Sequence, residues 1–289
     1  MKKRAPIKSV GLCLKPGSAE AGDVARTLDG WLAERGVEVW IDREAAHWLG
    51  REGREREEIT AAVDVLIVLG GDGTLLAAAR EAGTRAVPIL GVNLGTLGFL
   101  AEVAPEEQFE VLERVLAGAY ETVARMRLRI VARRSGHELA DTLALNDAVI
   151  TRSELSRMID LRTLADGSPV TTYHGDGLIV STPTGSTAYT LSAGGPILMP
   201  GSKVFVMTPI CPHTLTQRPL VLGEETQLEI RVFPRDGTAQ LTIDGQIGVT
   251  LEAGDVVSIT ESEHPAHFVV SPFRSRFDVL RAKLHWGEG

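Results

Sequence analysis

Apolar and polar positions follow two different periods along this chain. Over roughly the first 120 residues, short apolar runs typical of buried strands alternate with segments of helical periodicity. Strands are expected at 7–14, 37–41, 63–69 and 87–92, and helices at 19–35 and 75–82. Strands interleaved with helices predict a mostly parallel sheet with covered faces.

From about residue 122 the period changes to two. Arginines at 125, 127, 129 and 133 alternate with apolar residues, which predicts a strand with one wet face. Further strands are expected at 178–181, 203–207, 227–233, 241–243, 256–260 and 267–270, and Asp-Gly pairs at 166, 236 and 244 suit hairpin turns. We therefore expect an α/β domain over 1–122 and a β-rich domain over 123–274. The weakly helical segment 275–289 is expected to pack back onto the first domain.

Composition and charge narrow the possible partners. The chain has 289 residues, is 44% hydrophobic and 24% charged, and carries a formal net charge of −8, so it is an ordinary globular chain. Without a basic run beyond residues 2–4, nucleic acid and anionic membranes are poor partners. A phosphate ligand would have to be held by local Arg, backbone N–H groups or a metal ion.

The cysteines and the N-terminus point to a reducing compartment. Cys13 and Cys211 are far apart and form no CxxC, which argues against a disulfide scaffold and a zinc cluster. The apolar stretch 10–14 is too short for a secretory core, and no later stretch approaches a membrane-spanning length. We therefore expect a cytoplasmic protein.

The first candidate for chemistry is the sequence Gly70-Gly71-Asp72-Gly73-Thr74, between a predicted strand and a predicted helix. Free backbone N–H groups and a helix N-terminus at such a junction favour phosphate binding. Asp72 is unusual there, because a carboxylate repels phosphate. It is either a helix cap or the group that accepts the proton of an attacking hydroxyl; the glycines on both sides favour the second interpretation.

A second cluster combines glycines with small hydroxyl residues. It begins at His174-Gly175-Asp176-Gly177 and continues through residues 181–189 and 192–196. Structural turns also use these residue types, but so long a run favours a polar loop that holds adenine, ribose hydroxyls or phosphates. Asp176 is suited to binding a hydroxyl or an amide.

Four further residues carry weaker signals. Asn146 and Asp147 interrupt an apolar strand and need partners, either in a ligand or in a turn or buried hydrogen-bond network. Arg157 would balance a ligand phosphate or remain a solvated surface group. Gln246 follows Asp244-Gly245 and reads most simply as part of a hairpin.

Together these segments resemble the bacterial NAD kinases. The matching pieces are GGDGT at 70–74, GVNLGTLGFL at 91–100, LALND at 143–147, GDGLIVSTPTGSTAYTLSAGGPI at 175–197 and PHTLTQRPL at 212–220. The resemblance implies the fold of the NAD kinases and diacylglycerol kinases: an N-terminal α/β domain and a C-terminal β-sandwich-like domain, with NAD in the cleft between them. It also implies a homodimer or homotetramer in which a neighbouring subunit supplies some site residues.

The resemblance further implies a reaction and a set of site residues. A phosphoryl group of ATP, another nucleotide or polyphosphate would pass to the 2′-hydroxyl of the adenosine ribose of NAD, with Mg²⁺ or Mn²⁺ bound to the donor and no protein ligand of the metal assigned. Asp72 would be catalytic. The positions implied to bind the substrates are Gly71, Asp72, Gly73, Asn146, Asp147, Arg157, His174, Asp176, Thr187, Ala188, Tyr189, Thr190, Leu191, Ser192 and Gln246.

Two departures and two alternatives accompany this assignment. Many relatives have Asn-Glu where this chain has Asn146-Asp147, and His174 stands where relatives often have Arg, which bears on the choice between NAD and NADH. A lipid kinase sharing GGDGT would need an apolar groove, and no such stripe is evident. A non-catalytic NAD-binding regulator would have no need of Asp72.

Overall fold

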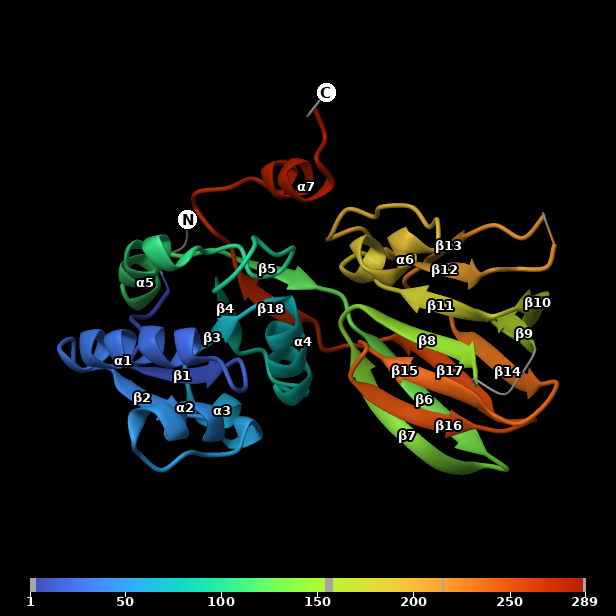
Figure 1. The fold of residues 1–289 in the computed structure, drawn as a ribbon, viewed down its shortest axis with the longest axis horizontal. Helices are drawn as coiled ribbons and strands as arrows, with labels where there is room; N and C mark the ends of the chain where they lie inside the picture. Colours follow the sequence, from blue (N-terminus) through green and yellow to red (C-terminus); the bar gives the residue numbers. More distant parts are fainter. Residues whose placement is uncertain (1–3, 154–157, 215, 288–289) are drawn as a thin grey trace. The chain divides into compact units, whose positions relative to one another are not determined.

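A computed structural model describes residues 4–153, 158–214 and 216–287. The chain divides into two compact units: Met1–Ala124 together with Ala266–Gly289, and Arg125–Pro265 (Figure 1). No helix in the described ranges is long and apolar enough to cross a membrane.

The first unit is built on a six-stranded sheet with the strand order β2-β1-β3-β4-β18-β5. Its strands are β1 (Ser9–Leu14), β2 (Glu38–Ile41), β3 (Val65–Gly70), β4 (Pro88–Asn93), β5 (Thr122–Arg125) and β18 (Ala266–Val269). The pairs β1–β2, β1–β3, β3–β4 and β4–β18 are parallel. The prediction of a mostly parallel sheet is confirmed, and its carboxyl edge gathers the ends of β1, β3 and β4.

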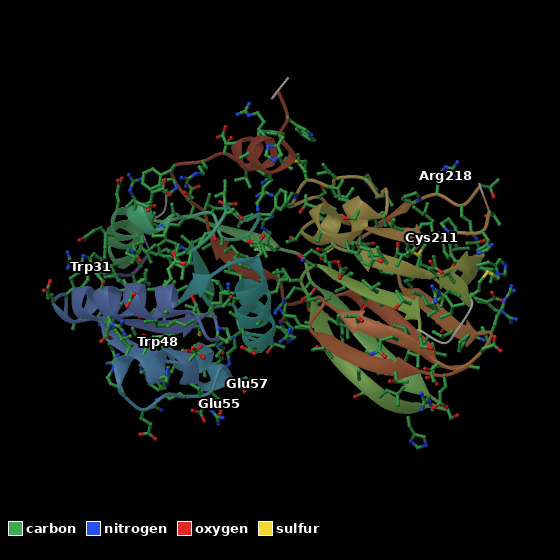
Figure 2. The ribbon with its side chains drawn as sticks, viewed as in Figure 1. Trp31, Trp48, Glu55, Glu57, Cys211 and Arg218 are labelled. Carbon is green, nitrogen blue, oxygen red and sulfur yellow. The ribbon has the colours of Figure 1, made fainter. Side chains whose placement is uncertain are left out.

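Helices cover both faces of this sheet. They are α1 (Ala19–Ala33), α2 (Arg43–Leu49), α3 (Arg56–Ala62), α4 (Asp72–Glu81) and α5 (Gln108–Leu116). The 3-10 turn η1 (Pro105–Glu107) and α7 (Arg276–Leu284) belong to the same unit. Alternate residues of β1 and β3 pack with the buried faces of α1 and α5. There Trp31, which Figure 2 labels, contacts Phe109 at a ring distance of 5.3 Å. Gly11 and Gly91 on the other face leave room for Ile59 of α3 and Leu75 of α4.

The strand predicted at 267–270 is present as β18 (Ala266–Val269), but its assignment to the β-rich domain was wrong. β18 pairs in parallel with β4, through His267 with Pro88 and Phe268 with Ile89. The chain thus returns to the first sheet before α7. Short apolar strands carry no sequence signal for the sheet they join, because either sheet buries them equally well.

The second unit contains two six-stranded sheets, ordered β10-β9-β14-β17-β6-β7 and β13-β12-β11-β8-β15-β16. The strands are β6 (Leu128–Arg134), β7 (His137–Ala144), β8 (Asp147–Arg152), β9 (Ile159–Ala165), β10 (Ser168–Gly175), β11 (Gly177–Ser181), β12 (Val204–Ile210), β13 (Leu220–Gly223), β14 (Leu228–Pro234), β15 (Ala239–Ile243), β16 (Ile247–Leu251) and β17 (Val256–Glu261). Side chains of both sheets share one apolar core, which confirms the β-sandwich-like architecture. The 3-10 turn η2 (Gly185–Thr187) and α6 (Tyr189–Ser192) follow β11.

Two of the three Asp-Gly pairs form hairpin turns. Asp166 and Gly167 join β9 to β10, and Asp244 and Gly245 join β15 to β16, all four with positive φ, as a type I′ turn requires. The pair at 236–237 was wrongly read as a hairpin, because β14 and β15 belong to different sheets. Its Asp-Gly turn instead reverses the chain between the two layers.

The arginine-rich segment also differs from the prediction. Arg125 and Arg127 are buried, and only the arginines further along β6 follow the expected wet face. β5 ends at Arg125 and β6 begins at Leu128, so the alternation does not run through one continuous strand. Arg127 Nε donates to the carbonyl of His264 at 2.6 Å, and burial lowers the pKa of Arg127 to about 10.

Candidate active site

The glycine turn lies where β3 ends at Gly70 and α4 begins at Asp72. A Cβ at Gly70 would lie 2.5 Å from Thr74 Oγ1, so only glycine lets the turn close so tightly. At Gly71 and Gly73 a Cβ would meet no atom within 4 Å. The backbone at these two positions is therefore open to an approaching ligand at the start of a helix, where negative charge is favoured.

Asp72 is held by the backbone of a second loop. Its Oδ2 accepts the N–H of Phe99 at 2.8 Å, and its Oδ1 accepts the N–H groups of Leu100 and Ala101 at 3.0 Å each. The cap of α4 is Gly71, with no side-chain cap bond, so the interpretation of Asp72 as a simple helix cap is wrong. Since each carboxylate oxygen has two lone pairs, Oδ2 keeps one position for a further donor.

The loop that grips Asp72 is itself closed by Asn93. Asn93 Nδ2 donates to Thr96 O at 2.7 Å, and its Oδ1 accepts the N–H of Gly95 at 3.0 Å. A Cβ at Gly98 would overlap Asp72 Oδ1. Asn93 and Gly98 were part of a recognised motif without being assigned a role, because their partners lie in another segment of the chain.

A pocket of about 290 Å³ opens beside the glycine turn in the first unit. Its acidic lining residues are Asp72 and Glu20, and its cationic ones are Lys15 and Lys283. In the described part of the chain, no Lys or Arg forms an ion pair with Asp72. The pocket thus joins a positioned carboxylate to open backbone and two cations, which suits a hydroxyl next to a phosphate.

In the second unit, Asn146 and Asp147 stand at the turn between β7 and β8. The carboxylate of Asp244 holds this turn by accepting the N–H groups of Leu145, Asn146 and Asp147 at 2.7–3.1 Å. The two strands belong to different sheets, so the predicted single strand was wrong. Asp244 was missed, because an Asp-Gly pair in a hairpin is fully explained by its turn.

Asp147 is a buried acid beside another acid. Burial, reinforced by the neighbouring negative charge of Asp244, raises the pKa of Asp147 to about 7. Within the described residues its carboxylate has no ion-pair partner. Near neutral pH the side chain of Asp147 is therefore a mixture of its protonated and ionised forms. The protonated form can donate a hydrogen bond, and the ionised form can only accept one.

The hydroxyl-rich run after β11 is less exposed than expected. Ser181, Thr182 and Ser186 are fully buried. Their hydroxyls bond to backbone groups of this run and of the 145–146 turn. Thr190 is also fully buried, which removes it from the candidate contact surface. Thr187 and Leu191 are partly exposed, and Ala188, Tyr189 and Ser192 are exposed.

His174 and Asp176 are each held by a charged neighbour. His174 Nδ1 lies 2.8 Å from Asp160 Oδ1, and Arg152 Nε donates to Asp176 Oδ1 at 2.8 Å. Sequence reasoning missed Asp160 and Arg152, because nothing in their own segments marks them. Both pairs are partly exposed, so they remain accessible to a polar ligand.

The site residues of the second unit form two groups at opposite ends of the β8–β11 pair. Asp147 is paired with Ser181 and shares its end with Asn146, Gln246 and the 187–192 loop. Asp176 lies just before the other end of β11. It is five residues before Ser181, which corresponds to about 17 Å at the rise of an extended strand. Arg157 lies outside the described residues.

Known proteins match this chain over nearly its whole length. Two family models match: the ATP-NAD kinase N-terminal domain over residues 10–120 and the ATP-NAD kinase C-terminal domain over residues 145–271. An NAD kinase of Syntrophotalea carbinolica is 46% identical over 284 residues, which are 98% of this chain and 100% of that protein. An NAD kinase of Geobacter sulfurreducens is 44% identical over 283 residues with the same coverage.

Two solved structures have the same fold. A yeast NADH kinase complexed with NADH superposes with a TM-score of 0.91 at 25% identity, covering 99% of this chain and 89% of that one. An NAD kinase from Archaeoglobus fulgidus in complex with ATP gives a TM-score of 0.77 at 28% identity, covering 95% of this chain and 99% of that one.

Proposed function

The chain belongs to the NAD kinase family, and from this premise we propose how its residues carry out the reaction. The acceptor is the 2′-hydroxyl of the adenosine ribose of NAD, and the donor is ATP, another nucleotide or polyphosphate. The family assignment excludes the lipid-kinase alternative. The supporting observation is the anchored carboxylate of Asp72 beside open glycine backbone.

In this proposal Asp72 orients the acceptor hydroxyl and takes its proton. A carboxylate is a weak base toward an alcohol, so early deprotonation of the hydroxyl is disfavoured. In a loose phosphoryl-transfer transition state the hydroxyl becomes acidic only as the new bond forms, and orientation contributes more than basicity. The three N–H groups on Asp72 fix its direction, and the remaining lone pair of Oδ2 accepts the hydroxyl.

The second unit is proposed to hold the rest of the dinucleotide. Asn146, Asp147, Gln246 and the exposed part of the 187–192 loop form one binding group, supported by their common end of the β8–β11 pair. Asp176 stands about 17 Å away by strand rise, and His174 precedes it by two residues, near the end of β10. We propose that they serve NAD bound in a neighbouring subunit of a homodimer or homotetramer. Arg157 is kept as a proposed phosphate contact.

The pocket beside the glycine turn is also suited to a divalent cation that is bound together with the phosphoryl donor. In residues 4–153, 158–214 and 216–287, no group of three His, Cys, Asp or Glu side chains is arranged to hold a metal ion. Mg²⁺ in phosphoryl transfer needs only one or two carboxylates, because donor phosphates and water complete its shell. Glu20 lines the pocket and fits that demand. When bound, Mg²⁺ or Mn²⁺ neutralises charge on the phosphates.

The proposed function is tested by a coupled assay. Purified protein is incubated with NAD, MgCl₂ and ATP, and NADP is detected with an NADP-specific dehydrogenase; parallel reactions contain polyphosphate or NADH. We expect NADP from NAD and ATP. If every donor and acceptor combination gives no product while NAD still binds, the reaction is refuted and a binding-only regulator takes its place.

We also propose that the protein works in the cytoplasm, supported by its two free cysteines.

A further inference from the structure

Two lysines from opposite ends of the chain line the pocket beside the glycine turn. Lys15 follows directly after β1, and its backbone N–H donates to Leu69 O at 2.8 Å. This bond places Lys15 beside Gly70, whose Cβ, if present, would lie 3.1 Å from the Cβ of Lys15. The stem of Lys15 thus lies against the turn, at the carboxyl edge of the sheet where parallel α/β folds bind ligands.

Lys283 reaches the same pocket from α7. The helix is capped by Ser275, which exchanges hydrogen bonds with Asp278, and its buried residues are Val279 and Leu280. Lys283 is four residues after the first and three after the second, so all three share one helix face. A lysine on the packed face of a helix is uncommon, and this position directs it toward the pocket.

Both ammonium groups lack an ion-pair partner in the described part of the chain. In the described residues, neither Lys15 nor Lys283 forms an ion pair, whereas Arg281 on the same helix pairs with Asp278. The chain as a whole carries a net charge of −8, which opposes the approach of a polyanion. Two unpaired cations beside open glycine backbone provide the local attraction that a phosphate chain requires.

We propose that Lys15 and Lys283 bind the polyphosphate chain of the phosphoryl donor and position its terminal phosphate beside Asp72. Both are positioning residues that act with the N–H groups of the glycine turn. This inference rests on the proposed function and deepens it by naming the groups that recognise the donor. It also assigns α7 a role: the C-terminal helix brings the second cation to the site.

The test compares Lys15→Ala, Lys283→Ala and Lys283→Arg with two controls. Lys8→Ala removes an exposed lysine just before the other end of β1, and Arg281→Ala removes a paired cation of α7. We expect each Lys→Ala change at the pocket to raise the KM for ATP about tenfold or more, as for a lost charge-assisted hydrogen bond. The KM for NAD should stay unchanged. Lys283→Arg should keep the KM for ATP close to its native value, and both controls should match the native chain.

A binding measurement without turnover separates this inference from the proposed function. Inorganic tripolyphosphate with MgCl₂ is titrated calorimetrically into the native protein and the variants. Weaker binding to Lys15→Ala and Lys283→Ala supports the proposal even if the native chain forms no NADP. Equal tripolyphosphate binding and equal ATP KM would overturn it. A rise in ATP KM with unchanged tripolyphosphate binding would also overturn it, because the lysines would then recognise the nucleoside and not the phosphates.

Discussion

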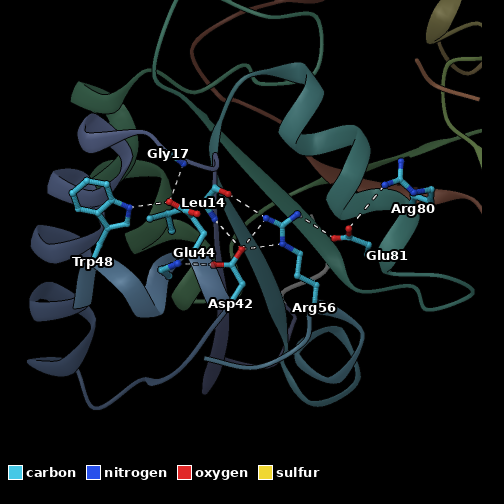
Figure 3. A network of polar contacts seen from close by, with 9 residues as sticks. Leu14, Gly17, Asp42, Glu44, Trp48, Arg56, Arg80 and Glu81 are labelled. Carbon is cyan, nitrogen blue, oxygen red and sulfur yellow. Dashed lines mark hydrogen bonds and ion pairs between the residues drawn. The ribbon is translucent and has the colours of Figure 1, made fainter. Parts of the chain in front are cut away.

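Asp42 and Asp72 occupy equivalent places in the first unit, yet their charges are handled differently. Each follows a strand of the parallel sheet and stands at the start of a helix. Asp42 accepts the N–H groups of Leu14 and Ala45 at 3.2 and 2.8 Å, together with Arg56 Nε at 2.9 Å (Figure 3). Asp72 accepts three backbone N–H groups and forms no ion pair among the described residues.

The network around Asp42 is complete in itself. Arg56 is bonded to Asp42, to Leu14 O and to Glu81, as Figure 3 shows. Asp42 is 2% exposed, so its charge meets a cation and not the solvent. Asp42 and Asp72 each line a pocket, but of the two carboxylates only Asp42 forms an ion pair among the described residues. The comparison indicates that a carboxylate fixed by backbone alone, with its charge left for a ligand, marks the chemical site, whereas a paired one marks structure.

Asp72→Asn gives the largest expected effect on the reaction. The amide cannot take the proton of the hydroxyl. Its NH₂ group would also face backbone N–H groups that bond to the carboxylate in the native protein, so the orientation of the side chain is lost as well. We expect kcat to fall by a factor on the order of 10² to 10⁴, with NAD binding retained. Steady-state kinetics and NAD calorimetry measure the two separately. Turnover near the native value would remove Asp72 from the catalytic role.

Arg56→Met tests the other half of the comparison. It leaves the buried carboxylate of Asp42 without its cation, which costs about 3–5 kcal/mol of unfolding free energy. Denaturant unfolding measures this loss, and the double variant Asp42→Asn/Arg56→Met should recover part of it because no buried charge remains. The kcat per folded molecule should stay at the native value. A fall in kcat without loss of stability would place the Asp42 network in the active site.

The sequence predicted the fold class because its periodicities are local. β3, with six buried residues in succession, and the short alternating strands of the second unit can be recognised without knowledge of their neighbours. The sheet that β18 joins and the sheet change at 236–237 depend on pairings between distant segments. The burial of Arg127 likewise depends on the carbonyl of His264, 137 residues away.

The same limit applies to the candidate site. Asp72 could be singled out, because glycines surround a carboxylate where a phosphate turn is expected. Asp72 bonds to the backbone of residues 99–101, and Asp244 bonds to the backbone of the Asn146 turn. These bonds join segments 27 to 99 residues apart, and the sequence composition does not indicate such contacts. Thr190 was included because the resemblance implied the whole range 187–192, and its burial is set by packing.

Gly98→Ala tests whether the anchoring of Asp72 matters as much as its charge. The new Cβ would overlap Asp72 Oδ1, so the loop or the carboxylate must shift, at a cost of about 1–3 kcal/mol. We expect lower kcat and lower stability together. Gly95→Ala is the matched control, since the nearest atom to its Cβ would be Asn93 Oδ1 at 3.9 Å. If both variants behave alike, the close approach at Gly98 is not what holds Asp72.

Asp147 extends the comparison to a buried carboxylate for which the described residues provide neither an ion pair nor a set of N–H groups. Its pKa is raised from 3.8 to about 7 in the folded chain, so folding favours its protonated form. The stability that it contributes is complete below pH 4 and is lost as the pH rises through about 7. Between pH 6 and 7 this one group should lower the unfolding free energy by about 1 kcal/mol.

Asp147→Asn removes this titration, so its unfolding free energy should vary less than that of the native chain over the same interval. Denaturant unfolding at pH 6 and pH 7 measures the difference, and Asp141→Asn, which removes a surface carboxylate paired with Arg129, is the control. Parallel pH profiles for the native chain and Asp147→Asn would show that Asp147 is ionised throughout. The negative charge at the Asn146 turn would then resemble that of Asp72, held ready for a ligand without a cation of its own.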